Sequence, residues 1–117
     1  MGVADEFDKR RIIQESVPGK QMTLAHIIAS PVPELYERLG IEEKGAIGIA
    51  TLTPCEAAII AADIATKTSD VEIGFLDRFT GSLVIAGDVA SVENAMLAIN
   101  DTLEKLLGFT PAMITRT

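Results

Sequence analysis

The stretch AIGIATLTPCEAAIIAADIATKT, residues 46–68, decides the fold. It opens with Ala46 to Leu52, where apolar and β-branched residues predominate, as is typical of a buried strand. Thr53 lies three residues before Glu56, a spacing that predicts a capping box at the start of a helix. Pro54 directly follows Thr53, which predicts that the helix begins at Pro54. We expect this helix to run to the end of the stretch with one apolar side. That side is expected to consist of Ala57, Ile60, Ala61 and Ile64.

The chain after this stretch predicts a hairpin and a second helix. Val71–Phe79 and Leu83–Ala86 have the composition of strands, and Thr80–Ser82 forms a tight connection between them. A long helix is expected from about Ser91 to Leu107, and Gly108 follows it at the position where helices often end in a left-handed residue. The apolar side expected for this helix comprises Val92, Ala95, Met96, Ile99, Leu103 and Leu106.

The predicted order of strand, helix, strand, strand and helix lacks one strand of a ferredoxin-like antiparallel sheet. Phe109–Thr115 can supply it, although Pro111 restricts that segment to an edge or a coil. Gln21–Ala29, predicted to be a strand buried on both faces, fits better. A core strand ahead of the unit that it completes is what a circular permutation produces, so we predict a permuted α+β fold. A short helix over Glu34–Leu39, closed by Gly40, is expected between these parts.

Composition and charge exclude several classes of function. The 117 residues suit one domain, over about residues 11–117, behind a flexible polar tail at 1–10. The formal net charge of −7 argues against nucleic acid as a partner. No run approaches about 20 apolar residues, so we expect no membrane span and a soluble cytoplasmic protein. One cysteine and one histidine cannot form a zinc site of the usual Cys/His type within one chain.

Long runs spread over nearly the whole chain carry a further signal. They are IIQE at 12–15, VPGKQ at 17–21, TLAH at 23–26, GAIGI at 45–49, EIGFLDRFTG at 72–81 and ITRT at 114–117. These runs resemble the circularly permuted bacterial microcompartment (BMC) shell proteins of the PduU/EutS type, which occur in propanediol- and ethanolamine-utilisation organelles. The resemblance covers residues from about 11 to 117.

The resemblance implies an assembly function without catalysis or a cofactor. The protein would form a cyclic homohexamer and tile, with other shell proteins, into a microcompartment wall in the cytoplasm that encloses enzymes. The loop that faces the hexamer axis in the family matches Phe79, Thr80, Gly81 and Ser82. The N-terminal strand, residues 11–17, would join a small parallel β-barrel that plugs the axis. Its barrel residues here are Ile12, Ile13, Gln14, Glu15 and Ser16. The family's lysine at the hexamer edge matches Lys67.

The residues that could carry chemistry favour structural roles. His26 lies within an apolar strand, so we expect a packed or hydrogen-bonded side chain. Cys55 has no partner of the Cys/His kind. Asp77 and Arg78 face opposite sides of a strand, so each is expected to pair across a strand or a subunit border. The alternative function is an oligomeric domain that senses a small molecule, but the sequence offers it no Gly-rich phosphate loop or arginine cluster.

Overall fold

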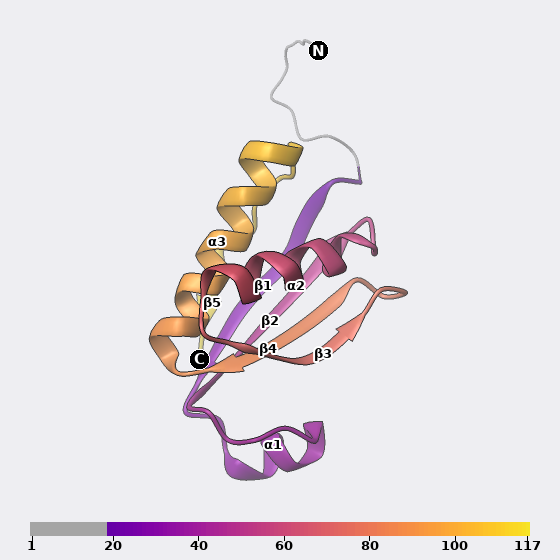
Figure 1. The fold of residues 1–117 in the computed structure, drawn as a ribbon. Helices are drawn as coiled ribbons and strands as arrows, with labels where there is room; N and C mark the ends of the chain where they lie inside the picture. Colours follow the sequence, from indigo (N-terminus) through magenta and orange to yellow (C-terminus); the bar gives the residue numbers. More distant parts are fainter. Residues whose placement is uncertain (1–18) are drawn as a thin grey trace.

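The computed structural model describes residues 19–117, so the predicted tail at 1–10 and the predicted barrel strand at 11–17 lie outside the described residues. The described part forms one five-stranded sheet and three helices, shown in Figure 1. In chain order these elements are β1 (Gln21–Ala29), α1 (Pro33–Leu39), β2 (Ala46–Thr53), α2 (Ala57–Thr68), β3 (Glu72–Asp77), β4 (Ser82–Gly87), α3 (Val89–Leu107) and β5 (Ile114–Arg116).

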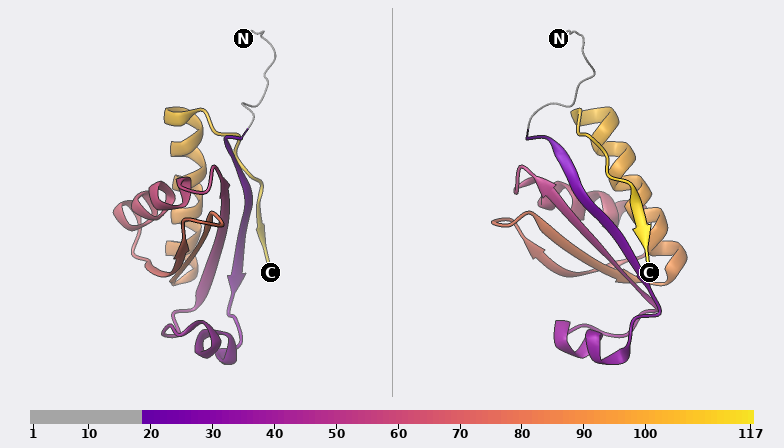
Figure 2. Two further views of the ribbon diagram at one scale, coloured as in Figure 1. Left: turned by 90° about the vertical axis from the view of Figure 1, so that its right-hand side faces the viewer. Right: turned by 180° about the vertical axis from the view of Figure 1, so that it is seen from behind.

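The strand order β3-β4-β2-β1-β5 confirms the predicted permutation. β1 pairs antiparallel with β2 along its length, from Gln21 opposite Thr53 to Ala29 opposite Ala46. It thereby supplies the strand that β2–α2–β3–β4–α3 lacks. The other candidate segment also enters the sheet, because β5 adds to the outer side of β1 as a short parallel edge strand (Figure 2). The sheet is therefore mixed, where an antiparallel one was expected.

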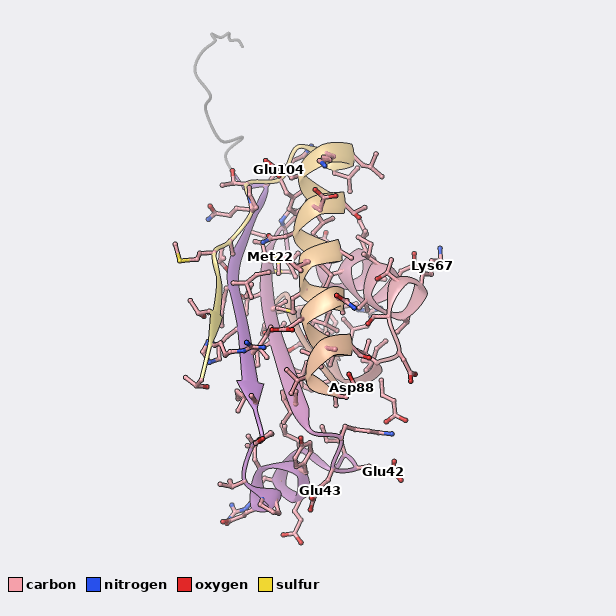
Figure 3. The ribbon with its side chains drawn as sticks, turned by 90° about the vertical axis from the view of Figure 1, so that its left-hand side faces the viewer. Met22, Glu42, Glu43, Lys67, Asp88 and Glu104 are labelled. Atoms are coloured by element: carbon pink, nitrogen blue, oxygen red, sulfur yellow. The ribbon has the colours of Figure 1, made fainter. Side chains whose placement is uncertain are left out.

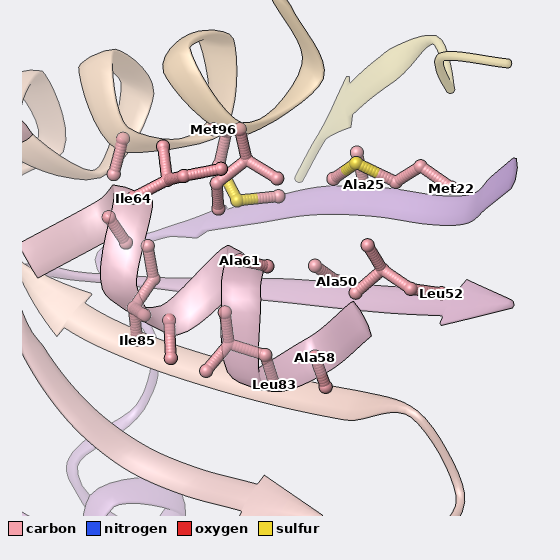
Figure 4. Packing of buried hydrophobic residues seen from close by; sticks show 14 of the residues in the cluster. Met22, Ala25, Ala50, Leu52, Ala58, Ala61, Ile64, Leu83, Ile85 and Met96 are labelled. Carbon is pink, nitrogen blue, oxygen red and sulfur yellow. The ribbon is translucent and has the colours of Figure 1, made fainter. Parts of the chain in front are cut away.

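α2 and α3 pack against each other over one face of the sheet, and the core fills the space between (Figures 2 and 4). The buried side chains of α3 are Val92, Ala95, Met96, Ile99 and Leu103, all predicted. Leu106 was also expected there and is exposed. Phe109 fills that end of the core instead, because the chain folds back after α3 and the Phe109 N–H donates to the Leu103 carbonyl at 3.1 Å.

β1 is buried on one face, not on both as predicted. Met22, Ala25 and Ile27 lie in the core, whereas Leu24 is exposed and His26 is half-buried. The other face of β1 stays accessible because α2 and α3 cover only one face of the sheet (Figure 2). An apolar run therefore overstated the burial of this strand.

The predicted capping box at the start of α2 is wrong. Thr53 is the last residue of β2, Pro54 follows a cis peptide bond, and the helix begins only at Ala57 with Glu56 as an N-cap that makes no side-chain hydrogen bond. The side of α2 that packs on the sheet is rich in alanine, and Ile60 is exposed instead of buried. The buried side chains of α2 are Ala57, Ala58, Ala61, Ala62, Ile64 and Ala65.

α1 lies apart from the two-helix layer, at the end of the sheet where β1 stops and β2 begins (Figure 1). As predicted it ends at Gly40, whose φ of 73° is left-handed. The hydroxyl of the buried Tyr36 accepts the Gly45 N–H at 3.1 Å. Lys44 bridges Glu42 and Glu72 at 3.3 Å each, and the Glu42 carboxylate is the main reason that the pKa of Lys44 is raised.

Candidate functional site

The loop predicted to face a symmetry axis is the turn between β3 and β4, and it is fixed by side chains of its own. Asp77 Oδ1 accepts the Phe79 N–H at 2.8 Å, and this bond, followed by the Thr80 hydroxyl, lowers the pKa of Asp77 below its ordinary 3.8. The Thr80 hydroxyl donates to Ser82 Oγ at 3.1 Å. Asp77 thus bonds its own turn instead of a cation on a neighbouring strand. A partner across a subunit border stays a prediction for Asp77.

Gly81 closes this turn in a place that admits no other residue without strain. Its φ is +77°, and a Cβ added there would lie 2.3 Å from the carbonyl oxygen of Leu52. The approach is close because the Leu52 N–H donates to the Gly81 carbonyl at 2.9 Å. The turn is therefore bound to the end of β2 and held in a defined position.

The outer side of the turn carries a large exposed aromatic ring. Phe79 is 78% exposed, and the Arg78 guanidinium stands 4.9 Å from the centre of its ring, within the range of a cation–π contact. Together with Ile59 of α2, Leu76 and Asp77, these residues line a shallow hollow of about 430 Å³. We call these five residues the β3-side surface.

Lys67, the predicted edge residue, lies in the last turn of α2, and its side chain points away from the sheet (Figure 3). Its Nζ is 2.9 Å from the Asp63 carboxylate, which confirms the predicted pair. Cys55, just before α2, lies close to Gly81. The turn lies beside the start of α2 and Lys67 lies in its last turn, so they are at opposite ends of a helix that measures about 15 Å from Ala57 to Lys67 at 1.5 Å per residue.

The C-terminal segment is held to the sheet by side chains from two elements. The Asn100 side chain in α3 both donates to the Ala112 carbonyl at 2.6 Å and accepts the Ala112 N–H at 3.0 Å, as a neighbouring strand would. Arg116 forms an ion pair with Glu93 of α3. Between α3 and β5 these contacts leave an open groove of about 310 Å³. It is lined by Ile27, Glu93, Asn94, Leu97, Ile114 and Arg116, and we call it the β5-side groove.

His26 is hydrogen-bonded on both ring nitrogens, as the structural interpretation predicted. Nδ1 lies 2.6 Å from the Thr115 hydroxyl and Nε2 lies 2.9 Å from the Thr117 hydroxyl. Both partners belong to the C-terminal segment, so His26 fastens that segment to β1.

The remaining chemistry-bearing groups do not converge on a reaction centre. Within residues 19–117, no three His, Cys, Asp or Glu side chains come together in a way that could hold a metal ion. Cys55 is a half-buried free thiol. In the same part of the chain, no helix combines the length and the apolar character that crossing a membrane requires. The features that the described residues do form are the β3-side surface, the β5-side groove and the fixed β3–β4 turn.

Sequence reasoning missed the residues that hold β5. Asn100 did carry a signal, because it lies four residues after Met96 and three before Leu103, inside an otherwise apolar helix side. A polar residue in such a place usually has a specific hydrogen-bond partner. The pair of Glu93 and Arg116 had no local signal, since the two residues are 23 positions apart.

Comparison with known proteins agrees with this architecture. Residues 46–117 match the model of the BMC domain family. The chain belongs to this family of bacterial microcompartment shell proteins, which are structural components and not enzymes.

Within the family, the permuted shell proteins are similar over almost their whole length. The shell protein PduU of Salmonella typhimurium is 57% identical over 108 residues, covering 92% of this chain and 93% of that protein. The shell protein EutS of the same organism is 56% identical over 110 residues, with 94% and 99% covered. The solved structure described as "CutR flat hexamer, form 1" superposes with a TM-score of 0.82 at 52% identity, covering 92% of this chain and 99% of that one. The prediction of a permuted shell protein is confirmed.

Proposed function

We propose that this shell protein forms cyclic homohexamers that tile into a microcompartment wall, with Phe79–Ser82 around the ring axis and Lys67 at the outer edge. The observation that carries this proposal is the placement of the two features at opposite ends of α2. A residue near the centre of a ring and a residue at its rim must be separated within the subunit. The hexameric form described for the similar CutR chain supports the same subunit number.

The proposal extends to the N-terminal residues. Ile12, Ile13, Gln14, Glu15 and Ser16 of each copy would pair around the axis into a parallel barrel, where every strand has a neighbour and no edge is left unpaired. The barrel would narrow or close the opening within the ring of β3–β4 turns. Other shell proteins would be lateral neighbours in the wall, and enclosed enzymes would lie behind it.

The ring itself is tested with the purified full chain. Native mass spectrometry should give the mass of a hexamer, and electron microscopy at high protein concentration should show hexagonal sheets or tubes. A chain that stays monomeric at every concentration would overturn the proposed function.

The axial assignment is tested by deleting residues 1–17. The hexamer should persist without them, and a reconstruction of the ring should lose density on the axis while the turns at Phe79–Ser82 remain around it. Density on the axis that survives the deletion would show that another segment occupies it. Loss of the ring would show that these residues build the ring and do not merely plug it.

A further inference from the structure

The fixed β3–β4 turn presents a positive charge that the rest of the described chain does not neutralise. Among residues 19–117, Arg78 has no acidic side chain within ion-pair distance. The neighbouring Asp77 carboxylate is directed into its own turn, where it accepts the Phe79 N–H at 2.8 Å. The Arg78 guanidinium lies 4.9 Å from the centre of the Phe79 ring, a contact that restrains its position and leaves its charge without an opposite partner.

The proposed ring would repeat this charge six times around one opening. With Phe79–Ser82 around the axis, the adjoining Arg78 of every copy lies near the axis as well. Like charges gathered around a narrow opening repel one another, and they do so more strongly where little water separates them. An acidic group beside each guanidinium would remove that cost.

The chain that precedes β1 emerges at the same end of the sheet as this turn (Figure 1). β1 starts opposite the end of β2, and the same end of β2 is paired with Ser82, the first residue of β4. Two strand spacings, about 10 Å, thus separate the start of β1 from the turn. Glu15 is the nearest acidic residue ahead of Gly19, and four residues span up to about 13 Å. Its carboxylate is therefore within reach of Arg78.

The alternation of side chains along the proposed barrel strand decides which way Glu15 would point. Successive side chains of a strand face opposite sides, so Glu15 shares one side with Ile13 and Val17 while Gln14 has the other. Side chains already fill the interior of an eight-stranded barrel, and six strands enclose less space. Six carboxylates inside such a barrel would be buried charges without partners, which is costly. The Glu15 side would therefore face outward, toward the surrounding turns.

We propose that the Arg78 guanidinium of each copy binds the Glu15 carboxylate of an N-terminal strand and thereby holds the barrel in the opening. This inference rests on the proposed ring and barrel and names the contact that fastens one to the other. The occupant is a segment of this chain, because it supplies the opposite charge at the required distance. Both partners lie near the axis, so the contact is compatible with cyclic symmetry. Exposed ion pairs are individually weak, but six of them act together on one barrel.

The test compares Arg78→Glu, Glu15→Arg and the double variant with the wild type, all as full chains. Native mass spectrometry checks that each forms hexamers, and hydrogen-exchange mass spectrometry follows the peptide that contains residues 12–17. Each single variant should exchange about tenfold faster or more in this peptide, because six attractions become six repulsions. The double variant restores opposite charges and should bring the exchange back close to that of the wild type.

Arg38→Glu is the matched control, since Arg38 is an exposed arginine on α1, at the other end of the sheet. It changes the net charge by the same amount and should leave the exchange of residues 12–17 as it is in the wild type. Hexamers of Arg78→Glu that keep wild-type protection, or a double variant protected no better than the single ones, would overturn the ion pair. Loss of the hexamer in Arg78→Glu would overturn it too, since Arg78 would then support the ring and not the barrel.

Failure of the proposed function gives different results. A wild-type hexamer without protection at residues 12–17 would refute the proposed barrel. A wild type that forms no ring would refute the proposed ring itself.

Discussion

Gly81 shows how one residue joins two strands that are not consecutive in the chain. Its carbonyl binds the end of β2 and its N–H donates to the Asp77 carbonyl at 2.9 Å, so the β3–β4 turn cannot move without breaking a contact to β2. Both bonds need the left-handed backbone and the absence of a side chain. The position of Phe79 depends on the same geometry.

We predict that Gly81→Ala is much more destabilising than Gly40→Ala. Both glycines have positive φ, which costs an alanine roughly 1–2 kcal/mol. At Gly40 an added Cβ meets nothing within 4 Å, whereas at Gly81 it meets the Leu52 carbonyl. Backbone displacement at Gly81 should add about 1–3 kcal/mol. Urea unfolding of the two variants measures the difference, and equal losses would show that the turn tolerates the methyl group.

A second residue-scale prediction concerns Asp88, the N-cap of α3. Its Oδ1 accepts the Ser91 N–H at 2.8 Å, and this bond lowers the pKa of Asp88 below its ordinary 3.8. The stability that the carboxylate contributes is therefore full above the unfolded pKa and is lost as pH falls through the lower folded pKa. Asp88→Ala should unfold at lower urea than the wild type at about pH 7, and the gap should narrow near about pH 3.

Asp88→Asn is the control, because asparagine caps helices about as well as aspartate but does not titrate. Its urea midpoint at neutral pH should stay close to that of the wild type. A gap between wild type and Asp88→Ala that is the same at both pH values would mean that the ionised form of the carboxyl is not what stabilises the helix.

At the scale of elements, β5 is unusual because side-chain contacts, in addition to backbone hydrogen bonds, hold this strand in the sheet. Its backbone pairs with β1 over a short stretch, Ala25–Ile27 with Ile114–Arg116. His26, Asn100 and Glu93 add contacts from β1 and α3. The β5-side groove exists only while this strand is in place.

We predict that Asn100→Ala loosens the whole segment from residue 110 to 117. It removes two hydrogen bonds to Ala112 and leaves the backbone groups of that residue to find other partners, at a cost of about 1–3 kcal/mol. Hydrogen-exchange mass spectrometry should show faster exchange in the C-terminal peptide. Asp101→Asn, on the same helix, removes only the exposed pair with Lys105 and should leave that exchange unchanged. Unaltered exchange in Asn100→Ala would show that β1 alone retains the strand.

The elements differ in how well the sequence predicted them. α3 was predicted with its buried residues Val92 to Leu103, because a long helix that packs on a sheet keeps a regular apolar side. The start of α2 was mistaken, because the pattern at Thr53 and Glu56 fits a capping box and only the backbone path shows that the strand continues through Thr53. A pair such as Glu93 and Arg116 could not be predicted, because no sequence periodicity relates two residues that are so far apart in the chain. The turn at Phe79–Ser82 was predicted at the right place, whereas the hydrogen bond between Leu52 and Gly81 was not predicted.

At the scale of the whole molecule, the charge at Lys67 should decide how rings join. Lys67→Glu should still fold and form hexamers, but sheets or shells of those hexamers should weaken or fail, as electron microscopy would show. Lys105→Glu is a closely matched control. Lys105 is 71% exposed and Lys67 72%, and each is 2.9 Å from an aspartate one helical turn earlier. Sheets of Lys67→Glu that form like those of wild type would remove Lys67 from the edge.

The parallel direction of β5 also determines where attached peptides would emerge. The described chain enters β1 beside Thr110, and the backbone of Thr117 is bonded to Ile27 and Ala29 near the opposite end of that strand. The length of β1 separates these points by about 27 Å at 3.3 Å per residue. A fluorescent tag or cargo peptide joined after Thr117 would therefore leave the molecule from the end beside α1, far from the point where the described chain enters β1. A peptide attached there would extend the chain beyond the last strand of the sheet, whose own pairing with β1 ends before it.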